Sequence, residues 1–371
     1  MQTPAGGDEV CRSPESLDSP VQETIIVNRF PHSLRWLLFL IFVGVLFAQV
    51  ISPVAQGRAQ DSDASKKIGR PLPDLSSRIA QNRLSSALYV AGDLFKDRIL
   101  LVGERGLILQ SKDRGQSFAQ VSSPTRRLLS DVLLRSDGVA FAVGHESTIL
   151  RSKDADATWE AVHHDPEQDL ALFSIADAGA GKLVAVGAFG LILTSSDDGL
   201  TWEQGLVSED GPHLYSVKSH KEGLVTVGEF GSLYSSSDQG KSWKQLPTPY
   251  EGTLFDILIM KDRWILMGLR GNLWEGNVSR WKKISVPTDA TLFGGALLTD
   301  DTVIVVGAEG VSLLRSPTSG EWTSLEVREA DRRLLSEPLP LLDDSVLGLG
   351  EKGYRFILGH GGSPLKAGEQ R

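Results

Sequence analysis

A serine, an aspartate, a glycine and an aromatic residue recur along the chain at one fixed spacing. The pattern Ser-x-Asp-x-Gly-x-x-Trp is complete at 195–202 and 236–243, and related copies begin at Ser111 and Ser152. Repeated carboxylates beside hydroxyls are groups that acid–base catalysis or calcium binding uses. They also suit a tight turn, in which Asp accepts backbone N–H groups, Gly takes a positive φ and the ring packs underneath. Because the motif recurs in units that cannot share one active site, we interpret it as structural. The residues assigned to these turns are Ser111, Asp113, Gly115, Asp154, Trp159, Asp197, Gly199, Trp202, Asp238, Gly240 and Trp243.

Other reactive side chains are sparse. The single cysteine, Cys11, precedes the apolar segment of the chain, so the remainder has neither a thiol nucleophile nor a thiolate metal site. Three possible metal ligands are adjacent at His163, His164 and Asp165, but neighbouring residues on a strand point to opposite faces. No glycine-rich loop precedes a helix as phosphate binding requires. We therefore expect no cofactor, no metal site and no catalytic residue.

The turns belong to a repeat that fills most of the chain. A Val-Gly dipeptide or a close variant begins at 102, 143, 186, 227, 267, 306 and 349, with spacings of 39 to 43 residues. In six of the seven units another glycine follows three residues later, and an alternating apolar segment comes after it. Each unit contains four short β-branched or aromatic runs bounded by turn residues, which is typical of a propeller blade. The sequence predicts an all-β, seven-bladed β-propeller with four antiparallel strands per blade.

The repeat sets the expected domain boundaries. The propeller should occupy residues 73–360, after a linker over 60–72 and before a flexible tail over 361–371. The seventh unit lacks a Trp-bearing fourth strand. We expect the spare segment 73–84 to supply that outer strand and so to join the two ends of the chain.

Residues 1–59 are interpreted as a polar leader followed by an export signal. An uninterrupted apolar run over 36–48 follows two arginines and precedes small residues, as in a secretory signal peptide. Cleavage near Ala59 and an uncleaved anchor over 36–54 both remain open, as does a translation start near Val27. In each case we expect the propeller outside the cytoplasmic membrane, in the periplasm or on a side equivalent to the thylakoid lumen.

The charge balance excludes one class of partner. The formal net charge is −9 and the isoelectric point is about 5.4. Binding to nucleic acid generally needs a basic footprint, so we expect no nucleic-acid partner.

A local basic patch is nevertheless expected on one face of the propeller. The loops that join second to third strands, and each blade to the next, open on the same face. These loops carry several cations, one histidine and two phenylalanines, and two Arg pairs are each followed by Leu-Leu. The side chains could bind a partner, the arginines could pair with neighbouring glutamates as a solvated rim, or the phenylalanines could plug the channel. The partner-binding candidates are Arg105, Arg126, Arg127, His145, Phe189, Phe230, Arg270, Arg332, Arg333 and Lys352.

The two motifs together resemble a known family. Val-Gly-x-x-Gly-x-(Ile/Leu)-Leu followed by Ser-x-Asp-x-Gly-x-(Ser/Thr)-Trp is similar to the photosystem II stability/assembly-factor family, whose bacterial neuraminidase (Asp-box) repeats form seven-bladed propellers. The resemblance covers about residues 70–360. It implies a bacterial periplasmic, non-enzymatic binding or scaffold protein that acts near the membrane on an integral membrane protein or exporter complex. It also implies that the Asp-box turns lie on the rim, between third and fourth strands.

Sialidases share the Asp-box and provide the alternative function. Their chemistry needs an Arg clamp, a Tyr nucleophile paired with Glu, and an Asp acid, which departs from the usual pair of carboxylates. The nearest string to their Arg-Ile-Pro motif is Arg78-Ile79-Ala80, and Tyr89, Tyr215 and Tyr234 occupy strand-like positions. An extracytoplasmic glycoside hydrolase or a sugar-binding propeller therefore remains the second hypothesis.

Overall fold

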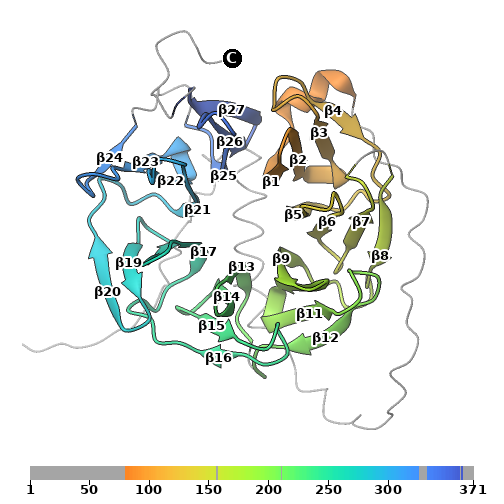
Figure 1. The fold of residues 1–371 in the computed structure, drawn as a ribbon, viewed down its shortest axis with the longest axis horizontal. Coiled ribbons are helices and arrows are strands. Elements are labelled where there is room, and N and C mark those ends of the chain that lie inside the picture. Colours follow the sequence, from red (N-terminus) through yellow and green to blue (C-terminus); the bar gives the residue numbers. More distant parts are fainter. Residues whose placement is uncertain (1–79, 156–157, 210, 326–331, 360, 362–371) are drawn as a thin grey trace, which may run out of the picture. The chain divides into compact units, whose positions relative to one another are not determined.

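A computed structural model describes residues 80–155, 158–209, 211–325, 332–359 and 361. The leader, the linker and almost all of the expected tail lie outside these residues, as does the signal or anchor segment. Successive antiparallel sheets follow one another along the described chain (Figure 1). Within the described residues, no helix is long and apolar enough to span a membrane.

Six blades contain four strands, and the seventh contains three among the described residues. Blades one and two comprise β1 (Tyr89–Phe95), β2 (Arg98–Gly103), β3 (Ile108–Ser111), β4 (Ala119–Val121), β5 (Leu129–Leu134), β6 (Ala140–Gly144), β7 (Ile149–Ser152) and β8 (Glu160–His163). Blades three and four comprise β9 (Leu172–Gly179), β10 (Lys182–Gly187), β11 (Leu191–Ser195), β12 (Glu203–Leu206), β13 (Leu214–His220), β14 (Gly223–Gly228), β15 (Leu233–Ser236) and β16 (Lys244–Gln245). Blades five to seven comprise β17 (Leu254–Ile259), β18 (Trp264–Gly268), β19 (Leu273–Asn277), β20 (Arg280–Ile284), β21 (Leu292–Leu297), β22 (Val303–Gly307), β23 (Ser312–Arg315), β24 (Trp322–Ser324), β25 (Leu335–Pro340), β26 (Val346–Gly350) and β27 (Gly353–Leu358).

The blades form a closed ring, which confirms the predicted seven-bladed propeller. The first strand of each blade contacts the first strand of the next, and β25 of blade seven contacts β1 of blade one. Buried apolar side chains form seven clusters, each between two neighbouring blades. Each sheet therefore buries both faces, and this explains the near-continuous apolar runs of the second strands.

The glycine of each Val-Gly dipeptide allows two strands to approach closely. In every blade this glycine pairs with the first residue of the inner strand, as Gly103 pairs with Tyr89. A Cβ added to Gly103 would lie 2.0 Å from the carbonyl oxygen of Leu88, and one on Gly268 would lie 2.5 Å from that of Thr253. A real Cβ cannot occupy such a position, so the landmark of the repeat is a packing requirement.

The closure of blade seven differs from the predicted outer strand. The predicted strand covers residues 73–84, of which the structure describes 80–84. Residues 81–84 lie in a 3-10 helix, η2 (Gln81–Ser86), which contacts β27. The Gly353 N–H donates to the Ala87 carbonyl (2.8 Å), and the Tyr89 hydroxyl donates to the Leu84 carbonyl (2.9 Å). The described residues before β1 thus pack onto blade seven through η2 and the hydrogen bond from Gly353, whereas residues 73–79 of the predicted strand lie outside the described residues.

Candidate functional site: the loop face

Two sets of loops meet on one face of the ring. A Cβ on Gly106, in the turn between second and third strands, would lie 2.0 Å from the carbonyl oxygen of Thr125, in the connection to the next blade. The same contact recurs in blade five between Gly271 and the Thr288 carbonyl at 2.1 Å. We call the face that carries these turns and connections the loop face. The Asp-box turns lie at the other ends of the strands.

One residue per blade is held in a left-handed conformation on the loop face. The seven residues have φ between 53° and 57°, and all but one of the residues that follow them are glycines, also with positive φ. In blade two the following residue is Ser147, with φ 49°. Because this backbone turns the side chain outward, Phe189 is 52% exposed and Phe230 is 77% exposed. The seven residues are Arg105, Glu146, Phe189, Phe230, Arg270, Glu309 and Lys352.

Basic side chains follow one another around part of this face. Arg127 pairs with Glu146 (2.5 Å), and Arg332 lies 3.9 Å from Glu309. The Arg332–Glu309 pair is exposed on both sides, as the solvated-rim interpretation expects, and such a pair contributes little to stability, whereas the Glu146 side chain of the other pair is largely buried. Arg126 is exposed, and Arg333 donates to the Lys352 carbonyl (3.1 Å). We call the basic residues from blade six to blade two the basic arc: Arg332, Arg333, Lys352, Arg105, Arg126 and Arg127.

His145 is partly buried, unlike most of the other candidates. It precedes the left-handed residue of its turn, Glu146, whose side chain lies 3.6 Å from His164 and is itself largely buried. The Nε2 atom of His145 is buried without a hydrogen-bond partner among the described residues, and burial lowers its pKa. Of the ten predicted partner-binding residues, this one is turned towards the protein.

Four aromatic residues that the repeat motifs did not reveal form a continuous row. They are the second residues of the inner strands β9, β13, β17 and β21. Their ring centroids are 5.3 Å apart for Phe173–Tyr215, 5.1 Å for Tyr215–Phe255 and 5.1 Å for Phe255–Phe293. We call Phe173, Tyr215, Phe255 and Phe293 the aromatic arc. Aligning the repeats would have found it, because each member lies thirteen or fourteen residues before a Val-Gly glycine.

Each member of the aromatic arc occupies a β-bulge. In blade three Leu172 pairs with Gly187 and Ser174 pairs with Val186, so Phe173 has no partner in the ladder. The same irregularity follows the first inner-strand residue in all seven blades. A bulge re-aims the side chain of the extra residue, and this brings the four rings together at the loop-face end of the inner strands.

A polar cluster fixes the aromatic arc beside the turn of blade three. The Phe189 N–H donates to His213 Nδ1 (2.9 Å), and the two rings lie 4.5 Å apart. The Glu229 carboxylate accepts the His213 N–H (3.1 Å) and the Tyr215 hydroxyl (3.5 Å). Burial lowers the pKa of His213, which keeps its Nδ1 an acceptor, and burial raises the pKa of the Tyr215 hydroxyl.

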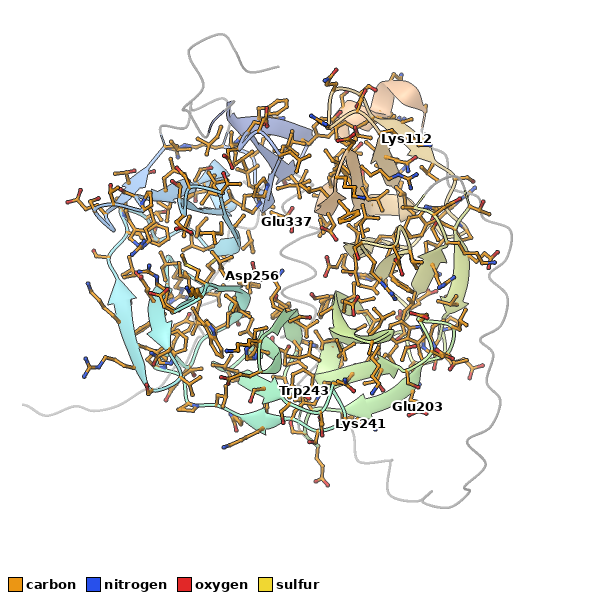
Figure 2. All side chains as sticks on the ribbon, in the orientation of Figure 1. Lys112, Glu203, Lys241, Trp243, Asp256 and Glu337 are labelled. Atoms are coloured by element: carbon orange, nitrogen blue, oxygen red, sulfur yellow. The ribbon has the colours of Figure 1, made fainter. Side chains whose placement is uncertain are left out.

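Carboxylates link successive inner strands further along the ring. The Ile175 N–H donates to Asp131 (2.9 Å), and the Gly92 N–H donates to Glu337 (2.8 Å) across the closure between blades seven and one. Figure 2 shows Asp256 and Glu337 at the inner edge of the ring. Lys218 Nζ lies 3.7 Å from Asp256. We call Asp93, Asp131, Asp256, Glu337 and Lys218 the inner belt.

Burial governs the protonation of the inner belt. It raises the pKa of Glu337 to about 8 and that of Asp93 to about 6, and it also raises the pKa of Asp131. The nearby Asp256 carboxylate raises the pKa of Lys218, which therefore stays charged. Each carboxylate in this belt already accepts a backbone N–H or a hydroxyl, so we assign the belt to holding the strands together.

The Asp-box aspartates make the hydrogen bonds of a turn. Asp238 accepts the hydroxyls of Ser236 (2.8 Å) and Ser242 (2.6 Å) and the Ser242 N–H (2.9 Å). Trp243 donates from its ring nitrogen to the Gly240 carbonyl (3.1 Å). The copies at Asp113 and Asp197 repeat the pattern. In Figure 2 Trp243 lies away from the inner edge of the ring.

The glycine of each complete Asp-box packs against the preceding blade. A Cβ on Gly199 would lie 2.2 Å from the Phe141 ring of blade two, and one on Gly240 would lie 2.5 Å from Val184 of blade three. Hydrogen bonds, above all those from Ser242, lower the pKa of Asp238 to about 2. The part of the chain that the structure describes contains no group of three or more metal-ligating side chains.

A family model matches the part of the chain that contains the complete Asp-box repeats. Residues 110–275 match a family model described as Photosynthesis system II assembly factor YCF48. This stretch carries the YCF48 family pattern. The match confirms the resemblance and runs from β3 to β19, so it contains Phe189, Phe230 and three members of the aromatic arc. No curated protein sequence matches the chain.

Solved propellers share the fold at low sequence identity. A structure of YCF48 bound to D1 peptide is 19% identical, with a TM-score of 0.61, and the match covers 72% of this chain and 92% of that one. YCF48 from Cyanidioschyzon merolae is 14% identical, with a TM-score of 0.61 and coverage of 77% and 96%. Virginiamycin B lyase from Staphylococcus aureus is 12% identical, with a TM-score of 0.62 and coverage of 72% and 93%. At these identities the likeness establishes the fold alone.

Proposed function

We propose that this protein is a non-catalytic binding propeller that aids the assembly of an integral membrane protein complex. The observation that carries the proposal is the unequal loop face, which has a basic arc on one part and exposed phenylalanines with an aromatic arc on another. Aromatic residues and arginine are the side chains most enriched at binding hot spots. The YCF48 family match and the D1 peptide bound to the similar YCF48 propeller support an assembly role.

Export is part of the proposal and rests on the sequence. The apolar run at 36–48, after basic residues and before small ones, favours transport across the cytoplasmic membrane. Cleavage near Ala59 would release the propeller, and an anchor over 36–54 would keep it beside the bilayer. Both place the loop face where it can meet extracytoplasmic segments of a membrane protein or an exporter complex.

Charge reversal of the two arginine pairs tests the proposal. The full chain would carry Arg126→Glu, Arg127→Glu, Arg332→Glu and Arg333→Glu and would be purified from detergent extracts of the native membranes. We expect the membrane partner that co-purifies with the unaltered chain to be lost. A matched control, Lys241→Glu, changes an exposed cation in an Asp-box turn away from the loop face. Partners retained after the fourfold change would contradict a role for the basic arc.

The hydrolase alternative has one feature in its favour. Tyr215 and Glu229 are in contact, as in the Tyr–Glu pair of sialidases. Burial and the Glu229 charge raise the pKa of the Tyr215 hydroxyl, however, whereas a nucleophile needs its hydroxyl activated. We expect no turnover of fluorogenic sialosides or other glycosides. Turnover that is lost in Tyr215→Phe would instead support the hydrolase.

A further inference from the structure

We propose that the aromatic arc and the two exposed phenylalanines form an apolar subsite for an extended peptide whose acidic residues lie on the basic arc. This inference rests on the proposed function and names the chemistry of the partner segment. It uses the exposed Phe189 and Phe230 of the loop-face turns and the adjacent tilted and edge-on rings of the aromatic arc in blades three to six.

The fold does not itself require aromatic side chains at the bulge position. In blades two and seven the equivalent residues are Ser130 and Ser336. Their hydroxyls donate to the first strand of the next blade, at the Leu172 carbonyl (2.5 Å) and the Tyr89 carbonyl (3.1 Å) respectively. A small polar residue at this position can therefore link neighbouring blades of the propeller. The four aromatic side chains on consecutive blades need another explanation, and ligand binding supplies one.

Packing does not explain the exposure of Phe189 and Phe230 either. Other blades place Arg, Lys or Glu at the same left-handed position, so the backbone accepts a charged residue there. Of the other three large apolar residues that are exposed among the described residues, Leu200 and Leu342 lie away from these turns, whereas Leu206 pairs with Leu191 beside the turn that carries Phe189. Phe189 contacts the His213 ring, and Glu229, the residue before Phe230, accepts the Tyr215 hydroxyl, so the two exposed phenylalanines flank the aromatic arc. A local apolar surface of this kind marks an interaction site.

The charges around this surface select the partner. The basic arc follows the aromatic blades around the ring on both sides, from blade six to blade two. In contrast, the one carboxylate of the polar cluster, Glu229, already accepts hydrogen bonds from His213 and Tyr215. A peptide with apolar side chains next to carboxylates matches both surfaces, whereas a basic peptide would face repulsion.

Binding of a defined peptide tests the inference. The probe is a blocked, fluorescently labelled peptide, Glu-Glu-Gly-Phe-Leu-Phe, and its partner peptide has serine at the three apolar positions. Fluorescence anisotropy with the purified full chain should give tighter binding of the apolar probe. The double variant Phe189→Ser, Phe230→Ser should weaken that binding about tenfold or more, because it removes two contact rings. Leu200→Ser, an exposed apolar residue in an Asp-box turn, should change nothing.

A second variant separates the aromatic arc from the rim. Phe293→Ser introduces the residue that the fold itself uses at this bulge in blades two and seven, and its thermal unfolding should stay cooperative. It should also weaken binding of the apolar probe while leaving the serine peptide unchanged. Equal affinity for both peptides, no binding of either peptide, or unchanged affinity in both phenylalanine variants would overturn the inference. Self-association that the same variants abolish would also overturn it and assign the surface to a second copy.

Failure of the inference can be told apart from failure of the proposed function. If the phenylalanine variants keep the membrane partner and the arginine reversal loses it, the proposed function stands and the apolar subsite is wrong. If the partner is retained in both sets of variants, the proposed function itself is wrong.

Discussion

At the scale of single residues, each loop-face turn contains one residue that we assign to binding and one that the fold requires. The left-handed position exposes its side chain on every blade except blade two, where Glu146 is largely buried, so the same turn exposes Arg105, Phe189 and Phe230. The glycine that follows serves the fold. Gly231 has φ +65°, and a Cβ there would lie 1.8 Å from the Tyr250 carbonyl oxygen.

Gly231→Ala should therefore destabilise the propeller strongly. We expect a loss of about 2–4 kcal/mol in the free energy of unfolding, because the substitution forces both a left-handed alanine and a backbone clash. Urea denaturation of the purified chain measures it. Gly205→Ala is the matched control, since its Cβ would meet nothing within 4 Å, and it should stay within about 0.5 kcal/mol. A comparable loss in both variants would contradict this account of the turn.

Asp238→Asn tests the structural assignment of the Asp-box. The folded-state pKa of Asp238 is about 2, below its ordinary value of 3.8, so its contribution is present above pH 3.8 and is lost as the pH falls towards 2. Removing the charge should cost about 1 kcal/mol at pH 7, since these hydrogen bonds face solvent. The difference from the unaltered chain should shrink on acidification. Loss of partner binding with unchanged stability would instead indicate a functional aspartate.

At the scale of elements, the strand that closes the ring depends on a protonated carboxylate. Glu337 of β25 accepts the Gly92 N–H of β1, and burial raises its pKa from 4.5 to about 8. An acid whose folded pKa is raised stabilises the fold most below its unfolded pKa. That stability is lost as the pH rises from about 4.5 through 8. The closure between blades seven and one should therefore weaken in mild alkali.

Glu337→Gln should reduce this pH dependence. The amide oxygen can still accept the Gly92 N–H, but no charge has to be buried. We expect the free energy of unfolding of the unaltered chain to fall between pH 5 and pH 8, and that of the variant to fall less and to be higher at pH 8. A smaller slope should remain, because burial also raises the pKa values of Asp93 and Asp131. Identical pH profiles would contradict the assigned role of Glu337.

The elements also show which features the sequence could predict. The seven-fold repeat was predictable because Val-Gly and the Asp-box are packing and turn requirements of every blade. The bulge at Phe173 was not, since a bulge depends on the register between two strands. Segment 81–84 was expected to be a strand, but it lies in a 3-10 helix whose hydrogen bonds join it to neighbouring residues and to Tyr89 of β1, and such bonds leave no alternating pattern in the sequence. The inner belt was missed because its members meet only when the ring closes.

At the scale of the whole molecule, the ring has two unlike faces. Asp-box turns, which pack on the preceding blade, occupy one side, and the loop face carries the basic arc and the exposed phenylalanines. Closure of the seven blades brings residues from every repeat to that face, and it joins residues as far apart in the sequence as Tyr89 and Ser336, which are hydrogen-bonded. We therefore expect partner contact to be confined to the loop face.

Site-specific photo-crosslinking tests this central claim most directly. A photoreactive amino acid would replace either Phe230, on the loop face of blade four, or Lys241, in the Asp-box turn of the same blade. Illumination of native membranes should crosslink the Phe230 variant to a membrane protein and leave the Lys241 variant without that product. Equal crosslinks from both positions, or crosslinks from Lys241 alone, would contradict a loop-face binding propeller.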